Sequence, residues 1–150
     1  MIQITLGEAH KRFLDFLKSS KKATATILAY GKDIQQLAEH LTNQGIQQLG
    51  QITTDHLEGF KENLLKTGYT SKSVSRKTNS LKTFFRFAKG ENYLDGNPAA
   101  TVSHPKYQSA PPRILTKLEY RALRDACRAD IRIAAIVELM LQTGIRIGEV

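Results

Sequence analysis

Residues 71–89 constrain the fold more than any other stretch, because their side chains separate onto two faces at the helical increment of about 100° per residue. The apolar face consists of Val74, Thr78, Leu81, Phe84, Phe85 and Ala88. The opposite face carries Lys72, Arg76, Lys82, Arg86 and Lys89, with Ser75, Asn79 and Thr83 between them. Phe87 falls on the polar side, where it is a candidate contact with another domain or subunit. The stretch is therefore predicted to be a helix that packs one of its two faces against a hydrophobic core.

The polar face of this helix carries charges of one sign. No acidic residue occurs between Glu62 and Glu91, whereas a solvated helix face usually mixes signs, because like charges one turn apart cost stability. Cations neutralise a phosphate backbone, and short hydroxyl and amide side chains fix the register on it. The predicted DNA-binding residues are Lys72, Ser75, Arg76, Asn79, Lys82, Thr83, Arg86 and Lys89. The alternative is a basic helix without a ligand.

The charge of the whole chain agrees with an anionic partner. Lysine and arginine number 22 against 14 aspartate and glutamate residues, which gives a formal net charge of +8. Nucleic acid is the commonest partner of such a protein. A membrane surface is a poorer match, because the basic face backs onto a bulky core stripe.

Three more helices are predicted before the basic one. Threonine and glutamate three residues apart, Thr5 and Glu8, form a capping box that starts the first of them. Gly68 ends the third. The expected ranges are 5–20, 24–45, 54–68 and 71–89. No run of alternating apolar residues suggests a strand, so residues 1–96 are predicted to form an all-α domain of four helices.

All four prolines of the chain lie between Asn97 and Pro112. Proline is rejected by helices and biases the residue before it toward an extended conformation. Residues 97–112 are therefore predicted to be a linker between two domains.

Two helices are predicted after the linker. Thr116 and Glu119 form a second capping box, and residues 131–141 are apolar almost all round, which is typical of a helix inside a large core. A segment this short is near the lower limit of about 40 residues for independent folding. We therefore expect residues 113–150 to begin a larger domain whose remainder is missing.

Several kinds of protein are disfavoured by what the sequence contains. The single cysteine, Cys127, excludes an internal disulfide and fits a reducing compartment. There is no signal-peptide pattern and no apolar run near the ~20 residues of a membrane span, so a cytoplasmic location is expected. The histidines show no metal-ligand spacing with one another or with Cys127, and no phosphate loop or dinucleotide fingerprint occurs. No metal and no cofactor are predicted.

The last ten residues, LQTGIRIGEV, resemble the first-arginine motif of the tyrosine recombinases, or phage integrases, including the Xer type. The resemblance continues through most of the chain in the expected order. Residues 70–88 are similar to the last helix of the family's core-binding domain. The Asn97-Pro98 and Pro105-Lys106 pairs resemble its linker, and residues 112–119 resemble its entry into the catalytic domain.

The resemblance implies a SAM-like core-binding domain over residues 1–96, a linker, and the N-terminal part of a catalytic domain over residues 113–150. Members of the family clamp double-stranded DNA between two such domains. They cut one strand through a 3′-phosphotyrosine and exchange strands within a tetramer, without metal or ATP. Lys106 in the linker completes the predicted DNA-contact set.

Two residues match the family's catalytic positions. Arg146 matches the first catalytic arginine, which would bind a non-bridging oxygen of the scissile phosphate. Glu149 matches the acidic residue one turn later, in a supporting role. On spacing alone, without the resemblance, the favoured interpretation of the two residues is a surface pair three residues apart.

The resemblance departs from the family in one large respect. The other catalytic positions, including the nucleophilic tyrosine, would follow residue 150, and all five tyrosines of this chain precede Arg146. The chain is therefore expected to bind DNA without cutting it, as the DNA-binding portion of a recombinase. The alternatives are a naturally short DNA-binding regulator of recombination sites, and a helical interaction module that binds an acidic protein.

Overall fold

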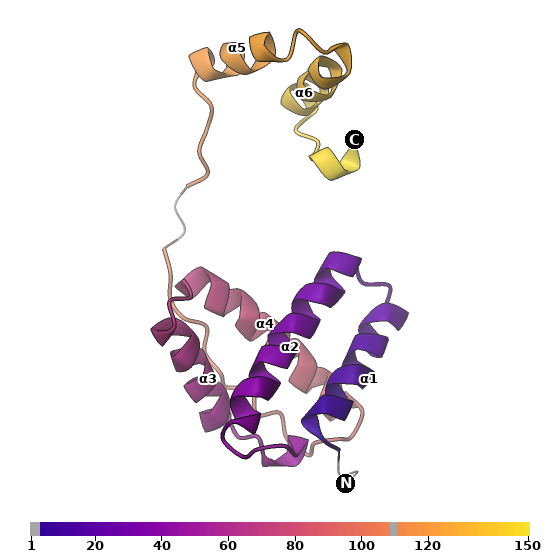
Figure 1. The fold of residues 1–150 in the computed structure, drawn as a ribbon, viewed down its shortest axis with the longest axis vertical. Helices are drawn as coiled ribbons and strands as arrows, with labels where there is room; N and C mark the ends of the chain where they lie inside the picture. The colour runs from indigo at the N-terminus through magenta and orange to yellow at the C-terminus, as the bar shows by residue number, and fades with distance from the viewer. Residues whose placement is uncertain (1–3, 109–110) are drawn as a thin grey trace. The chain divides into compact units, whose positions relative to one another are not determined.

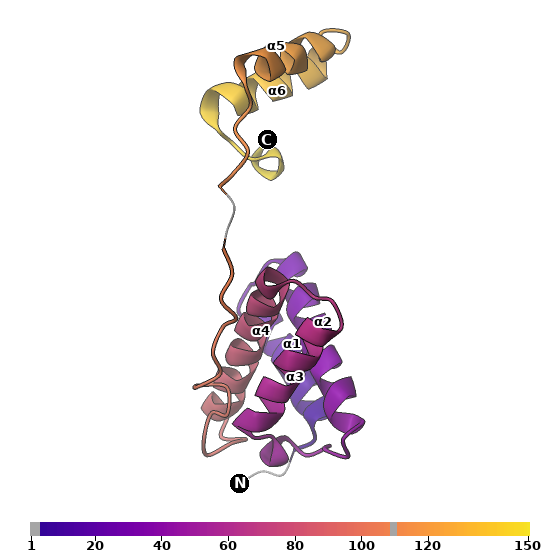
Figure 2. The same cartoon turned by 90° about the vertical axis from the view of Figure 1, so that its left-hand side faces the viewer.

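The computed structural model describes residues 4–108 and 111–150. The chain divides into two compact units, Met1–Gln108 and Ser109–Val150, and each is described by itself. The described residues form six α-helices and two short 3-10 turns, and among them there is no β-strand (Figures 1 and 2). The all-α prediction is confirmed.

The first unit contains four helices, close to their predicted ranges. They are α1 (Leu6–Ser19), α2 (Thr24–Thr42), α3 (Thr54–Lys66) and α4 (Ser71–Gly90), with the 3-10 turn η1 (Leu49–Gln51) between α2 and α3. The Thr5 hydroxyl accepts a hydrogen bond from the backbone N–H of Glu8, as the predicted cap requires. In Figure 1, α1 and α2 run side by side in opposite directions, and α4 packs against α1, α2 and α3.

The apolar face of α4 fills the centre of this unit. All six residues predicted to face inward are buried, and Phe84 and Phe85 are among the largest fully buried side chains. The core residues from the other helices include Phe13, Leu37 and Phe60. Burial of apolar area is the main favourable term in folding, so α4 is the element that holds the other three helices together.

Phe87 is also buried, which corrects the expectation that it faces another domain or subunit. Its ring centroid lies 4.9 Å from that of Phe16 and 6.1 Å from that of Tyr93. The chain turns back after α4, and this turn brings Tyr93 over the polar side of the helix. A helical projection cannot anticipate that cover, because it comes from outside the helix.

The start of the predicted linker packs on the first unit. Ala99 and Val102 are buried in its core. The Lys61 ammonium donates to the backbone carbonyl of Ser103 at 2.9 Å, and the Ser103 N–H donates to the Glu58 carboxylate at 3.2 Å. The domain boundaries predicted around residues 97–112 stay a prediction, and residues 109–110 lie outside the described ranges.

The second unit contains α5 (Lys117–Ala126), α6 (Ile131–Thr143) and the 3-10 turn η2 (Ile147–Glu149). The predicted capping box of Thr116 and Glu119 is present in both directions, and α6 ends at Gly144 with φ of 70°, a left-handed conformation that suits glycine. Neither helix contains a buried residue. The predicted burial of α6 is therefore not realised within this unit, because α5 covers only part of its surface.

None of the helices in residues 4–108 and 111–150 is both long enough and apolar enough to cross a membrane.

Candidate nucleic-acid interface

The predicted contact residues of α4 lie on its outer side. Lys72, Asn79, Arg86 and Lys89 are exposed, and Lys82 and Thr83 are partly buried. The Thr83 hydroxyl donates to the backbone carbonyl of Asn79 at 2.8 Å, and the Asn79 side chain is exposed. The helix therefore presents cations and short polar groups together over five turns. Whether these groups contact DNA stays a prediction.

A shallow groove runs between the first turns of α4 and the chain that follows residue 103. Four of the predicted residues, Lys72, Ser75, Arg76 and Asn79, line it together with Ser73 and Tyr107. His104 Nδ1 lies 3.2 Å from the Ser75 hydroxyl, so the chain is held against the helix at this point. Lys106 is exposed next to Tyr107. His104 and Tyr107, which flank Pro105 and Lys106 in the linker, thus lie beside the first turns of α4.

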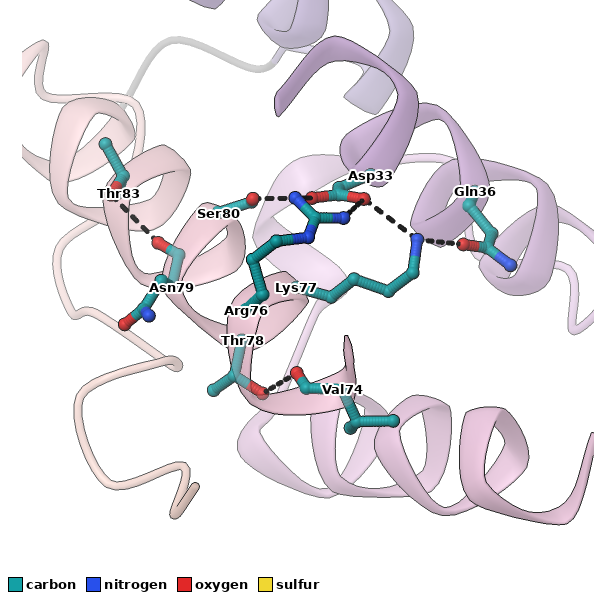
Figure 3. A network of polar contacts seen from close by, with 9 residues as sticks. All are labelled: Asp33, Gln36, Val74, Arg76, Lys77, Thr78, Asn79, Ser80 and Thr83. Carbon is teal, nitrogen blue, oxygen red and sulfur yellow. Dashed lines mark hydrogen bonds and ion pairs between the residues drawn. The ribbon is translucent and has the colours of Figure 1, made fainter. Parts of the chain in front are cut away.

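One acidic residue lies beneath this face. Asp33 of α2 is only 2% exposed, and it accepts hydrogen bonds from three residues of α4 (Figure 3). Arg76 engages both carboxylate oxygens, with Nη1 and Nη2 at 2.9 and 3.0 Å. Lys77 Nζ donates at 2.8 Å and the Ser80 hydroxyl at 2.6 Å. We refer to Asp33, Arg76, Lys77 and Ser80 as the Asp33 cluster.

The Asp33 cluster keeps its carboxylate ionised. Burial by itself raises the pKa of Asp33, but the hydrogen bonds from Arg76, Lys77 and Ser80 outweigh it and hold the pKa below its usual range. One carboxylate therefore faces two cations, and the formal charge of the cluster is +1. This positive charge lies partly beneath the face that was predicted from sequence to bind phosphate, at Lys77, and partly on it, at Arg76.

Sequence reasoning missed Asp33 as part of the site. Asp33 occupies the inward side of α2, three residues after Tyr30 and four before Leu37. A single acid on an inward stripe needs a buried cation or several donors as partners. Lys77 is the matching signal in α4, since it falls at the edge of the apolar side of that helix. The two signals together could have predicted the pair. His104 and Tyr107 left no comparable signal.

The predicted catalytic pair lies in the second unit. Arg146 is 86% exposed, with Nη1 3.5 Å from the Glu149 carboxylate. The backbone N–H of Arg146 also donates to Glu149, at 2.9 Å, so Glu149 caps the 3-10 turn η2. The guanidinium keeps most of its donors free. Their use on a scissile phosphate stays a prediction.

Within the described part of the chain, no three histidine, cysteine or acidic side chains lie close enough together to hold a metal ion.

Comparison with known proteins defines the class of this chain. The model of the phage integrase N-terminal SAM-like domain matches residues 10–92, which is more than half of the sequence. These residues span all of α2, α3 and α4, including the basic face and the Asp33 cluster. The chain therefore belongs to the phage integrase family, and the resemblance recognised from its motifs is confirmed.

The relatives in this family include the Xer tyrosine recombinases. The chain is 29% identical over 144 residues to tyrosine recombinase XerD of Rickettsia bellii, covering 92% of this chain and 47% of that protein. It is 32% identical over 149 residues to tyrosine recombinase XerC of Listeria innocua, covering 95% and 50%. The chain thus spans about half the length of these relatives.

Solved structures of integrases share the fold. A lambda integrase dimer bound to a COC′ core site matches with a TM-score of 0.74 and 24% identity, over 97% of this chain and 41% of that one. A lambda integrase tetramer bound to a Holliday junction matches with a TM-score of 0.75, also at 24% identity, over 97% and 42%. The N-terminal domain of a phage integrase from Haloarcula marismortui matches with a TM-score of 0.65 at 15% identity, over 70% of this chain and all of that one.

Proposed function

We propose that this chain is the DNA-binding portion of a site-specific tyrosine recombinase, and that it holds duplex DNA through the outer face of α4. The observation that carries the proposal is the composition of that face: cations on successive turns, no acid on the helix, and Ser75, Asn79 and Thr83 between the cations. The DNA-bound lambda integrase structures that share this fold support it.

The side chains of the face divide the work of binding. Lys72, Lys82 and Lys89 supply mobile point charges, while an arginine offers a planar fork that matches phosphate. Ser75 and Asn79 are short donors that fix position along the strand. Lys106 extends the positive surface from the helix onto the linker. Such a surface gives strong and salt-dependent affinity, because each neutralised phosphate releases counterions.

The second unit would act on the strand that the first unit holds. In this proposal Arg146 donates to a non-bridging oxygen of the scissile phosphate, where negative charge grows as the phosphorus is attacked. Glu149 orients that arginine through the contact described above. The tyrosine that attacks the phosphate is supplied by residues outside this chain, and the partners are other protomers assembled on the same DNA.

The test is the salt dependence of duplex binding by residues 1–150. Binding is measured by fluorescence anisotropy on a labelled duplex of about 30 base pairs between 50 and 300 mM salt. Lys82→Ala combined with Arg86→Ala should flatten the slope of log affinity against log salt by about 1.8, since each phosphate contact contributes about 0.9. The matched control is Lys11→Ala with Lys18→Ala, two exposed lysines of α1. An unchanged slope in the α4 variant would mean that this face is not the DNA surface.

A further inference from the structure

Lys77 is a largely buried cation at the joint between α2 and α4. Its side chain is 9% exposed, and its ammonium is held between α2 and α4. Nζ donates to Asp33 at 2.8 Å and to the Gln36 side-chain oxygen at 2.8 Å, and it lies 5.2 Å from the centre of the Tyr69 ring (Figure 3 shows the first two contacts). These partners occupy the ammonium, so we expect Lys77 to act through its neighbours and not by contacting DNA.

Arg76 is the only member of the Asp33 cluster that reaches solvent to a large extent. Its side chain is 51% exposed, whereas those of Asp33 and Lys77 are buried and Ser80 is fully enclosed. Arg76 lines the groove that runs beside Tyr107. Any anion that approaches the cluster therefore meets Arg76 first.

The charge of the cluster depends on the buried lysine. Arg76 and Asp33 alone would form a neutral pair, and a neutral pair attracts phosphate only weakly. Lys77 offsets the carboxylate from the buried side, which leaves a formal charge of +1 with its exposed part on Arg76. Two opposite charges close together in a poorly solvated site influence each other strongly. Lys77 lies 2.8 Å from the Asp33 carboxylate and therefore offsets its charge effectively.

The geometry of Arg76 is also suited to a second partner. A guanidinium has five N–H donors, and the contact with Asp33 uses one from each of Nη1 and Nη2. Three donors, including Nε–H, remain for another acceptor. Because Asp33 holds the fork in one orientation, less side-chain entropy is lost when a phosphate binds.

We propose that Asp33 positions Arg76 as a phosphate contact and that the buried Lys77 supplies the charge that keeps this contact attractive. This inference rests on the proposed function of the α4 face. It assigns to Lys77, a largely buried residue, an effect on DNA affinity that is usually found for residues in contact with DNA. Asp33 and Lys77 are positioning residues in this account, and Arg76 is the contact.

The experiment removes the buried charge and keeps the rest of the face. Lys77→Met retains the apolar stem, and Lys77→Gln retains a donor toward Asp33. The variant used is the one whose helical content, measured by circular dichroism, equals that of the parent. Without Lys77 the pair of Arg76 and Asp33 is neutral, so the slope of log affinity against log salt should fall by up to about 0.9, the value for one phosphate contact. Affinity at 0.1 M salt should then fall by up to about eightfold. Lys18→Met, which removes an exposed lysine from α1, is the charge-matched control and should leave the slope unchanged.

A second variant tests the origin of the effect. Asp33→Asn combined with Lys77→Met removes both buried charges and restores the cluster to +1, so the slope should return to the parent value. The affinity should remain a few-fold below the parent, since an amide holds a guanidinium less firmly than a carboxylate does. Recovery of the slope separates a charge effect from a packing effect, because the packing defect of Lys77→Met is still present.

Two results would overturn the inference. One is a salt slope equal to that of the parent in the folded Lys77 variant. The other is a salt slope that stays low when Asp33→Asn is combined with Lys77→Met. Failure of the proposed function gives a different result, because the variant with Lys82→Ala and Arg86→Ala would then also keep the salt slope of the parent. A loss of slope in that variant, with none in Lys77→Met, would retain the DNA face and reject the role of Lys77.

Discussion

Asp33 and Lys77 are 44 residues apart in the sequence, and their charged groups lie 2.8 Å apart at the joint between α2 and α4. Neither side chain is more than a tenth exposed. A buried ion pair is weak evidence for stability, because desolvation of the two charges offsets most of their attraction. Its more secure consequence is geometric, since the pair can form only when the two helices meet in one register. This joint also sets the position of Arg76 on the outer face.

Removing the carboxylate should destabilise the first unit strongly. Asp33→Ala leaves the Lys77 ammonium buried without its counter-charge, which costs about 3–5 kcal/mol in the free energy of unfolding. Urea unfolding followed by circular dichroism measures this change. The control is Asp15→Ala, whose carboxylate is exposed on α1 and whose loss should change stability by less than about 1 kcal/mol. Equal effects of the two substitutions would contradict the burial argument.

Asp33 should also make stability depend on pH in the acid range. Its pKa in the folded protein lies below the ordinary value of 3.8, so the folded state binds this proton less readily than the unfolded chain does. The contribution of Asp33 is therefore full above pH 3.8 and is lost as the pH falls through the lower folded pKa. Urea midpoints between pH 2 and 6 should fall more steeply toward acid in the parent than in Asp33→Asn. Parallel curves would show that Asp33 does not carry the effect.

Proteolysis should cut the chain after the part of the linker that packs on the first unit. Ala99 and Val102 are buried and Ser103 is held by Lys61 and Glu58, so a protease cannot take up the backbone there without local unfolding. Lys106 is exposed. Brief digestion with trypsin should therefore yield a folded product ending at about residue 106, identified by mass spectrometry.

A second digestion, with a protease of broad specificity, tests whether the packing of residues 97–103 protects them. Lys61→Met removes the bond from the ammonium to Ser103 and should make the backbone before residue 104 accessible, so that a protease of broad specificity trims the product further. If the parent is already trimmed to residue 96 under the same conditions, the packing of residues 97–103 does not protect them.

Arg146 should contribute little to DNA binding by residues 1–150. It is an exposed side chain and would add a single phosphate contact, so Arg146→Ala should change duplex affinity by less than about tenfold at 0.1 M salt. No covalent adduct should form on a nicked suicide substrate. In a longer chain that carries the nucleophile, the same substitution should slow adduct formation about 100- to 1000-fold, and Arg146→Lys should restore only part of it. A covalent adduct from residues 1–150 alone would contradict the assignment.

Local signals determined most of the helices. The hydroxyl of Thr5 and the reciprocal pair of Thr116 and Glu119 act within one turn, so their effect can be read from spacing alone. The inward face of α4 follows from the period of its apolar residues in the same way, and all six predicted positions are buried. The single-sign outer face is likewise a property of one helix. The family resemblance rests on motifs of this local kind.

Only the tertiary structure decided which distant groups meet. Phe87 is buried because the chain after α4 returns across it, and the linker is anchored because Lys61 reaches Ser103, 42 residues further on. The pairing of Asp33 with Arg76 and Lys77 is of the same kind. Helical period states which way a side chain points, but not what the rest of the chain places there. The sequence therefore determined that α4 would be basic on its outer face, and the packing of α2 against it decided that Arg76 would be held in place by a buried carboxylate whose charge Lys77 offsets.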